Sequence, residues 1–301
     1  MIGSRSLRTL STAPVQQAMP SRSAVLRLVR RMGLATLGLL VLALAVLAAV
    51  LAPWLAPHDP AAVSLTDRLQ PPLMAGHLFG TDALGQDVLS RVIFGARVSL
   101  LVGFSAVAVS GLIGVTLGLL AGFFGGWVDA VVMRIGEVQL AFPTIILYVA
   151  VMAVVGPGLE KLIAVIGVVG WVQYARVERA LALSLRELEY VQAARALGAS
   201  GRWIMLRHIL PNTLGPLTVV ASFGLASTIV IEASLSFLGL GVPPSVPSWG
   251  SMLADGRDYL RAGWWVATFP GLALTGCVLA VNLLGDWLRD ELDPLLKGAS
   301  A

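Results

Sequence analysis

Long runs without a charged residue constrain the fold of this chain more than any other feature of its sequence. Residues 33–52 carry no charge, and neither do residues 98–128 or 262–285. An α-helix rises about 1.5 Å per residue, so runs of this length cross the roughly 30 Å hydrocarbon core of a bilayer. The sequence therefore predicts an all-α polytopic membrane protein.

The composition excludes an ordinary soluble domain. Of the 301 residues, 57% are hydrophobic and only 13% are charged, whereas soluble domains carry about 25% charged residues. The net charge of +4 could indicate binding to nucleic acid, but excess arginine in a membrane protein is typical of cytoplasmic loops. We therefore expect a lipid bilayer around the chain and no nucleic acid partner.

Six membrane-spanning helices are predicted, with both termini in the cytoplasm. Lys and Arg are concentrated before the first span, between the fourth and the fifth, and after the sixth. Cytoplasmic loops are enriched in these residues, and with six spans the three segments fall on the same side. Arg91 and Arg97 go against this trend and suggest an interfacial helix. The fourth span is the weakest, because Lys161 and Arg176 bracket a short uncharged stretch. The predicted spans are approximately residues 33–52, 98–122, 131–155, 158–175, 213–240 and 263–285.

The chain divides into four parts. Residues 1–30, rich in Ser, Arg and Gln at their start, are predicted to form a disordered cytoplasmic tail. Residues 31–94 contain the first span and an outer segment. Residues 95–288 form the main transmembrane domain, with a cytoplasmic loop at 176–212. Residues 289–301 form a cytoplasmic C-terminal tail.

Three glycines indicate a close contact between helices. Gly114, Gly118 and Gly122 recur at intervals of four in the second predicted span. Small residues at this spacing let helix backbones approach closely in lipid. We therefore predict that another helix packs against this stripe.

Residues 239–250 cannot form a regular span. Pro243, Pro244 and Pro247 remove backbone donors and fix φ. Irregular backbone at membrane depth is tolerated only against protein or water. A loop that dips toward a cavity and a simple surface turn fit this segment equally well.

A polar segment, ELEYVQAARALGASGRWIMLRHILPN at residues 187–212, lies between two apolar spans. A helix over residues 189–197, at about 100° per residue, has two opposite arcs. One arc carries Tyr190, Ala193, Ala194 and Leu197. The other carries Glu189, Gln192 and Arg195.

The end of this helix is predicted from the residues that follow it. Gly198 is placed to end the helix, since glycine accepts the left-handed conformation of a C-terminal cap. Ser200 can cap a second short helix, which Pro211 is expected to stop. A face of alanines suits close approach to another protein, and an amphipathic connector resting on lipid headgroups fits the pattern equally well.

The same segment resembles the cytoplasmic "EAA" loop of the membrane subunits of ABC importers, written Glu-Ala-Ala-x3-Gly-x9-Ile-x-Leu-Pro. The residues that match at the right spacing are Ala193, Ala194, Gly198, Leu210 and Pro211. Two positions depart from it, because Gln192 stands where the motif has Glu and His208 where it has Ile. The missing carboxylate leaves open whether a charge contact at that position survives.

Further segments extend the resemblance over about residues 26–296. They are FGTDALGQDVLSRVIFGARVSL (79–100), AFPTIILYVAV (141–151), GWVQYARVERA (170–180), ASLSFLGLGVPPSVPSWGSML (233–253) and LGDWLRDELDP (284–294). Together they are similar to the C-type permeases of dipeptide, oligopeptide and nickel importers, in which residues 95–288 would be the type I ABC transmembrane domain.

The resemblance implies one half of a transporter in the bacterial inner membrane. Its partners would be a sister permease, two ATPase subunits that bind ATP and Mg²⁺, and an extracytoplasmic substrate-binding protein. Peptides are the implied substrate, with nickel or glutathione-like solutes as alternatives. The ATPase contact implied within residues 187–211 comprises Tyr190, Gln192, Ala193, Ala194, Leu197, Gly198, Ala199, Arg202 and Pro211.

The chain is not expected to be an enzyme. A P-loop needs Gly-x4-Gly-Lys followed by Ser or Thr, but Lys161 is followed by Leu and Lys297 by Gly. An intramembrane hydrolase would need a Ser–His or paired-Asp site, and the three histidines lie outside the predicted spans. We therefore predict no catalytic residue, and no cofactor or metal bound by this chain.

An ion-coupled secondary transporter is a less favoured alternative. Such a carrier needs ionisable groups near the middle of the membrane. Only Glu232, beside Ser234 late in the fifth predicted span, is a plausible candidate. These two residues could line a translocation path, but a buried, hydrogen-bonded structural role for Glu232 is favoured.

Overall fold

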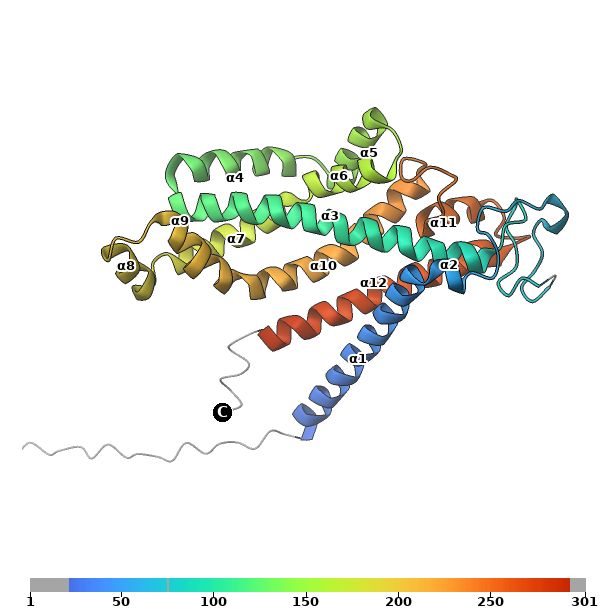
Figure 1. Cartoon of the computed structure of the whole chain (residues 1–301), viewed down its shortest axis with the longest axis horizontal. Helices are drawn as coiled ribbons and strands as arrows, with labels where there is room; N and C mark the ends of the chain where they lie inside the picture. The colour runs from blue at the N-terminus through green and yellow to red at the C-terminus, as the bar shows by residue number, and fades with distance from the viewer. Residues whose placement is uncertain (1–21, 75, 293–301) are drawn as a thin grey trace, which may run out of the picture.

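The computed structural model describes residues 22–74 and 76–292. Over these ranges the chain is helical and contains no strand, only two isolated β-bridges. The longest helices form an elongated bundle (Figure 1). The α-helices are α1 (Arg22–Val50), α2 (Ala52–Leu55), α3 (Val88–Phe124), α4 (Gly126–Leu140), α5 (Thr144–Val155), α6 (Leu159–Val169), α7 (Trp171–Leu185), α8 (Glu189–Ala196), α9 (Gly201–Ile204), α10 (Leu210–Phe237), α11 (Trp249–Arg257) and α12 (Trp264–Leu292). A 3₁₀ turn covers Leu65–Asp67 and a π-helical turn covers Met205–Ile209.

Among the described residues, four helical stretches are long and apolar enough to cross a membrane. They are Gly33–Val50 within α1, α3, the continuous stretch Gly201–Phe237, and α12. The pair α4 and α5 would make a fifth span that is bent by 87°. Pro143, which precedes α5, explains the break because it cannot donate a backbone hydrogen bond and restricts the residue before it.

The predicted fourth span, residues 158–175, is divided between two helices. α6 has 11 residues and α7 has 15, and they meet at Gly170. Neither helix alone reaches the length of a span. The prediction of several apolar spanning helices is therefore confirmed for four or five of them.

The glycine stripe of α3 lies against α7, as predicted. A Cβ atom added at Gly114 would lie 2.3 Å from the carbonyl oxygen of Trp171, and one at Gly118 would lie 2.4 Å from that of Ala175. Both positions are much closer than van der Waals contact allows, so only glycine permits this approach. α3 also contacts α1, α6, α10 and α12, which makes it the central helix of the bundle (Figure 1).

The predicted interfacial helix around Arg91 does not form. Arg91 lies in the first turns of α3, is buried, and pairs with Asp82. Its guanidinium also lies 3.4 Å from the carboxylate of Asp255 in α11. The charge of Arg91 is neutralised by two carboxylates within the protein. Its place in the sequence is therefore no evidence that this segment lies at the membrane surface.

α1 begins at Arg22, within the tail that was predicted at residues 1–30. Extending an existing helix costs far less than nucleating one, so the spanning helix continues toward the N-terminus. At the other end, α12 extends to Leu292, into the predicted tail 289–301. The remainder of both predicted tails lies outside the described residues.

The proline-rich segment 239–250 packs against the protein instead of forming a simple surface turn. Val242 is buried beside Leu235 and Val102, and the carbonyl of Gly241 accepts a 3.0 Å hydrogen bond from the amide of Gly158. The segment leads into α11, which Ser248 caps.

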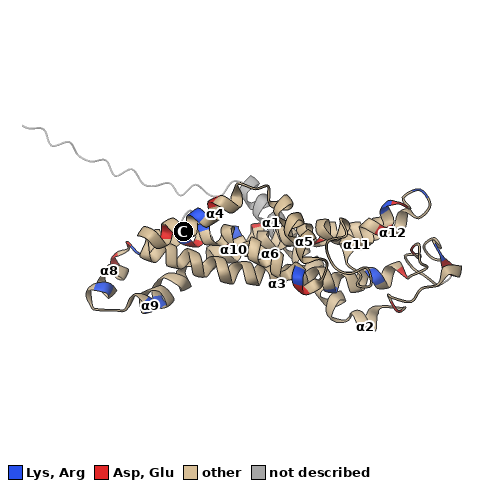
Figure 2. Ribbon diagram, turned by 90° about the horizontal axis from the view of Figure 1, so that it is seen from above, with Lys and Arg blue, Asp and Glu red and all other residues tan. Residues whose placement is uncertain are grey.

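The two ends of the bundle are built differently. α8 and α9 lie at one end, whereas the extended segment 56–87 and α11 lie at the other (Figure 1). Lys, Arg, Asp and Glu are prominent at both ends, and most of the long helices between them are free of charge (Figure 2). This distribution fits an apolar region embedded in the membrane, with a polar, solvent-exposed end on either side of it.

Candidate functional site

The polar loop contains the helix and the glycine cap that the sequence predicts. α8 spans Glu189–Ala196, and Gly198 has φ of +85°. The amide of Gly198 donates to the carbonyl of Arg195 over 3.0 Å, and that of Ala199 to Ala194 over 3.1 Å. These two bonds form a Schellman motif, which satisfies carbonyls at the helix end and fixes the direction of the following chain.

The second helical segment differs from the prediction. Ser200 caps α9 as expected, since its hydroxyl accepts a hydrogen bond from the amide of Trp203 over 3.3 Å. Pro211, however, does not stop the helix. It lies in the first turn of α10, and the chain remains helical from Gly201 to Phe237.

A π-helical turn lets the helix pass the proline. The amide of Leu210 donates to the carbonyl of Met205, five residues earlier. Proline removes one backbone donor and displaces the carbonyl four residues before it, and a π turn is wide enough to accommodate both effects. The prediction failed because sequence periodicity does not reveal such a turn.

One valine, which the sequence analysis missed, anchors α8. Val191 is fully buried in a cluster with Leu119 of α3, Ala182 of α7 and Ile204 of α9. It is the only aliphatic residue larger than alanine in α8, and that was a usable signal. The burial of Val191 thus packs α8 against three other helices.

The face that was predicted to contact a partner points outward. Tyr190 is 43% exposed and Leu197 is 90% exposed. Ala193 between them is exposed, and Ala194 and Ala199 are partly buried. Arg202 and Pro211 are exposed as well. The side chain of Leu197 therefore makes almost no contact within the described part of the chain.

Gln192 ties α8 to the end of α3. Its side-chain amide donates to the carbonyl of Arg186 over 3.0 Å, and the guanidinium of Arg186 donates to the carbonyl of Gly122 over 2.8 Å. An ionised glutamate could not donate the first of these bonds. The glutamine that departs from the motif therefore serves as an internal contact in this chain. Arg195 adds a cation–π contact, with its guanidinium 5.7 Å from the ring centre of Phe123.

His208 joins α8 to α9. Its ring centre lies 5.7 Å from that of Tyr190 and 4.7 Å from that of Trp203, both edge to face. This geometry is favourable for aromatic pairs. An aromatic cluster thus occupies the position where the motif has an isoleucine. A groove of about 650 Å³ borders α9 and is lined by Ser200, Arg202, Trp203, Leu206 and Arg207.

Glu232 and Ser234 are not brought together. Glu232 is fully buried, and its carboxylate accepts hydrogen bonds from Ser99 over 2.9 Å and from Ser236 over 2.8 Å. Ser234 instead donates to the carbonyl of Val230. The spacing of four between Glu232 and Ser236 was visible in the sequence, whereas Ser99 comes from α3 and was not. These contacts favour the structural role for Glu232.

Glu178 in α7 is a further buried carboxylate that was not predicted from the sequence. It is fully buried, and neither of its oxygens accepts a hydrogen bond from a described residue. A charged carboxylate that is buried without such partners is unfavourable. Ala175 and Ala182 lie three and four residues away and are equally buried, so helical spacing could have placed Glu178 on this face.

The chain matches two family models. The model described as "Binding-protein-dependent transport system inner membrane component" covers residues 114–298. The model described as "N-terminal TM domain of oligopeptide transport permease C" covers residues 20–72. Between them, the two models match the first predicted span and most of the transmembrane domain, including the loop.

Many known proteins are similar to the chain, and three of them illustrate the likeness. It is 47% identical over 271 residues to a putative peptide transport system permease protein of Brucella suis biovar 1, covering 90% of each protein. It is 45% identical over 268 residues to the di/tripeptide transport system permease protein DppC of Pseudomonas aeruginosa, covering 87% of this chain and 88% of that one. Its fold is similar to a chain of the MetNI methionine ABC transporter in inward-facing conformations, with a TM-score of 0.53 and 22% identity over 68% of this chain and 96% of that one. The chain therefore belongs to the family of inner membrane components of binding-protein-dependent transport systems.

Proposed function

We propose that this chain forms one half of the membrane pathway of an ATP-driven importer of peptides. The substrate class rests on the peptide permeases to which the chain is similar over about nine-tenths of its length. A sister permease would supply the other half, and an extracytoplasmic binding protein would deliver the substrate. Nickel and glutathione-like solutes are the alternatives within the same family.

The α8–α9 loop carries this proposal, because its geometry suits a mechanical contact with ATPase subunits. Moving a two-state gate from 1:99 to 99:1 takes about 5.5 kcal/mol of differential binding. A flexible loop cannot transmit such a free-energy difference. α8 is stiffened by its Schellman cap, by the buried Val191 and by the Gln192–Arg186 hydrogen bond.

The outward face of this loop is the proposed docking surface. It comprises Tyr190, Gln192, Ala193, Ala194, Leu197, Gly198, Ala199, Arg202 and Pro211. Gln192 is exposed and also donates to the carbonyl of Arg186. An ATPase groove that accepts α8 would cover the exposed Leu197 side chain. ATP and Mg²⁺ would be bound by the ATPase subunits, since this sequence has no P-loop.

The proposed topology has six spans and places both termini in the cytoplasm. α4 with α5 would form the third span, and α6 with α7 the fourth. This arrangement places the arginine-rich loop around α8 on the cytoplasmic side, in agreement with the positive-inside rule. It places the segment 56–87 and α11 on the outer side.

Uptake measurements test the function directly. A strain that lacks this gene should lose uptake of labelled di- and tripeptides and regain it with the wild-type gene. The purified chain alone should hydrolyse no ATP, and the chain purified from its own host should bring ATPase subunits with it. If the strain kept normal peptide uptake but lost uptake of nickel or glutathione, the transported substrate would be that solute and not peptides. ATP hydrolysis by this polypeptide alone would refute the proposal that separate subunits hydrolyse ATP.

A further inference from the structure

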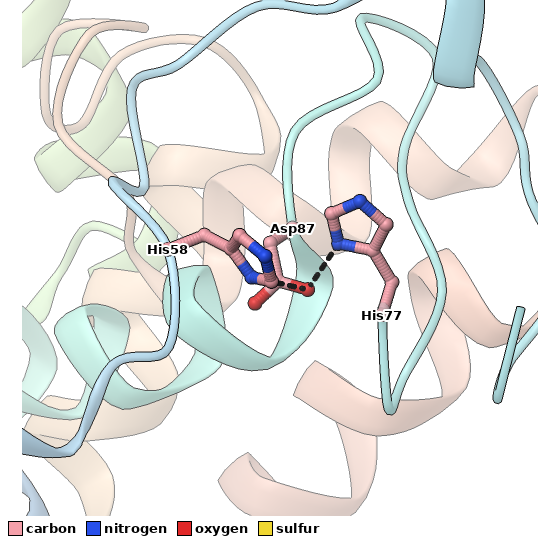
Figure 3. A group of neighbouring side chains, drawn as sticks. All are labelled: His58, His77 and Asp87. Carbon is pink, nitrogen blue, oxygen red and sulfur yellow. Dashed lines mark hydrogen bonds and ion pairs between the residues drawn. The ribbon is translucent and has the colours of Figure 1, made fainter. Parts of the chain in front are cut away.

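Two histidines and an aspartate from separate segments meet at the end of the molecule opposite α8 and α9. His58 follows α2, His77 lies at an isolated β-bridge with Met74, and Asp87 is the N-cap residue of α3. The three side chains point toward one another (Figure 3), and their potential ligand atoms all lie within 4.8 Å of one another.

One oxygen of Asp87 faces both imidazole rings. Oδ1 lies 2.8 Å from Nδ1 of His77 and 3.7 Å from Nδ1 of His58. The other oxygen, Oδ2, already accepts hydrogen bonds from the amide of Ser90 over 2.8 Å and from its hydroxyl over 2.6 Å. The capping contact of α3 therefore uses one oxygen and leaves the other for the histidines.

The backbone holds the three residues in place independently of any ion. The amide of His58 donates to the hydroxyl of Ser90 over 3.1 Å, and Thr81 forms an isolated bridge with Asp87. The side chain of Asp87 is 1% exposed, that of His77 is 12% exposed and that of His58 is 41% exposed. The cluster is thus a buried carboxylate flanked by imidazoles, with one side open to solvent.

A plain His–Asp hydrogen bond explains only half of this geometry. At 3.7 Å, Nδ1 of His58 is too far from Oδ1 for a hydrogen bond. Ligand bonds of about 2.0–2.2 Å at a tetrahedral angle place neighbouring ligand atoms roughly 3.3–3.6 Å apart. The two distances to Oδ1, 2.8 Å and 3.7 Å, lie on either side of that range, so small side-chain rotations would complete such a site.

We propose that His58, His77 and Asp87 bind one divalent transition-metal ion of the zinc class, with water as the fourth ligand on the exposed side of His58. Imidazole nitrogens favour zinc and similar ions over magnesium and calcium. A metal ion binds an imidazole through a ring nitrogen that carries no proton. Binding at Nδ1 of His77 would therefore replace the hydrogen bond between this nitrogen and Asp87. The ion would fasten the extended segment 56–87, which contains one 3₁₀ turn and no α-helix, to the start of α3.

Titration of the purified full-length chain with Co²⁺ and Zn²⁺ tests the site. The affinity tag must contain no histidine, and the protein is first treated with a chelator. We expect one Co²⁺ per chain with the visible absorption of a tetrahedral site, and Zn²⁺ should displace it. His58→Gln, His77→Gln and Asp87→Asn should each weaken binding at least tenfold. Asn is a good N-cap residue, so Asp87→Asn should keep α3 intact.

The chain offers a matched control in its third histidine. His208→Gln lies at the opposite end of the molecule and should leave the stoichiometry and affinity unchanged. Zn²⁺ should also slow proteolysis within residues 56–87 in the wild type and not in His77→Gln. The proposal is overturned if wild-type binding is no tighter than that of a folded His58→Gln/His77→Gln double variant. Binding that survives this double variant and is lost in His208→Gln would equally overturn it.

Discussion

A single glycine sets the direction of the loop that is proposed to contact the ATPase subunits. Gly198 has φ of +85°, and a Cβ atom there would meet nothing within 4 Å. A side chain at this position therefore meets no steric clash with neighbours, and its cost is confined to the backbone. That cost is roughly 1–2 kcal/mol for a non-glycine residue in the left-handed region.

Gly198→Val should consequently disturb the loop and leave the bundle intact. We expect normal membrane levels, a large loss of transport, and loss of ATPase subunits from the purified complex. Ser200→Ala is the matched control, because it removes a cap worth about 1 kcal/mol without changing the turn. Ala193→Glu, an exposed change that leaves the Schellman motif intact, should act like Gly198→Val. Full transport and full ATPase recovery in both Gly198→Val and Ala193→Glu would reduce the loop to a connector.

The buried carboxylate of Glu178 predicts that neutralising it stabilises the fold. The side chain is fully buried, and neither of its oxygens accepts a hydrogen bond from a described residue. An unpaired charge in such surroundings is unfavourable. Glu178→Gln, which keeps the shape of the side chain, should therefore be more stable than the wild type at pH 8, where a solvated glutamate is ionised.

Thermal unfolding in detergent at pH 8 measures this difference. The exposed Glu160→Gln is the control and should follow the wild type. A Glu178→Gln variant that unfolds at a lower temperature than the wild type would show that the carboxylate of Glu178 stabilises the fold.

At the scale of elements, the contact between α3 and α7 depends on the absence of side chains. A Cβ atom at Gly118 would lie 2.4 Å from a backbone oxygen, whereas one at Gly111 in the same helix would meet nothing within 4 Å. Gly118→Ala should push the two helices apart and destabilise the protein by about 1–3 kcal/mol. Gly111→Ala should be neutral or stabilise the helix by up to about 1 kcal/mol.

Thermal unfolding of the two alanine variants side by side checks this prediction, because they differ only in position along α3. If Gly118→Ala were as stable as Gly111→Ala, α7 could move away from α3 without a loss of folding free energy.

Elements that depend on local pattern were predictable, and those that depend on distant neighbours were not. Apolar runs predicted the long helices, and the wheel with Gly198 predicted α8 and its cap. The π turn before Pro211 and the bend at Pro143 both occur at prolines, and the apolar pattern does not specify whether a proline stops, widens or bends a helix. The helix α11 packs against α12 and α10, which the sequence pattern does not show. In the site, the same division holds, because Gly198 is a local feature, whereas the burial of Val191 needs three other helices.

At the scale of the whole molecule, the proposed topology predicts which end of the bundle faces the outside. Single cysteines at Ser200 and Ser245, both exposed, can be introduced on a Cys277→Ala background. An impermeant maleimide should label position 245 in intact cells, and position 200 only after permeabilisation. The buried Ser248 is unsuitable for this purpose. Labelling of position 200 with position 245 silent would invert the topology.

The central helix also has a mechanical consequence. The N-cap residue of α3, Asp87, lies beside the two histidines, and Arg186 hydrogen-bonds to the carbonyl of Gly122 in the last turn of the same helix. Its 37 residues make a rod of about 55 Å. The close glycine contact with α7 restricts bending over its second half. A tilt of about 3° at the outer end would displace the other end by about 3 Å over this length. One helix could thus work as a lever between the surface proposed to receive substrate and the surface proposed to meet the ATPases.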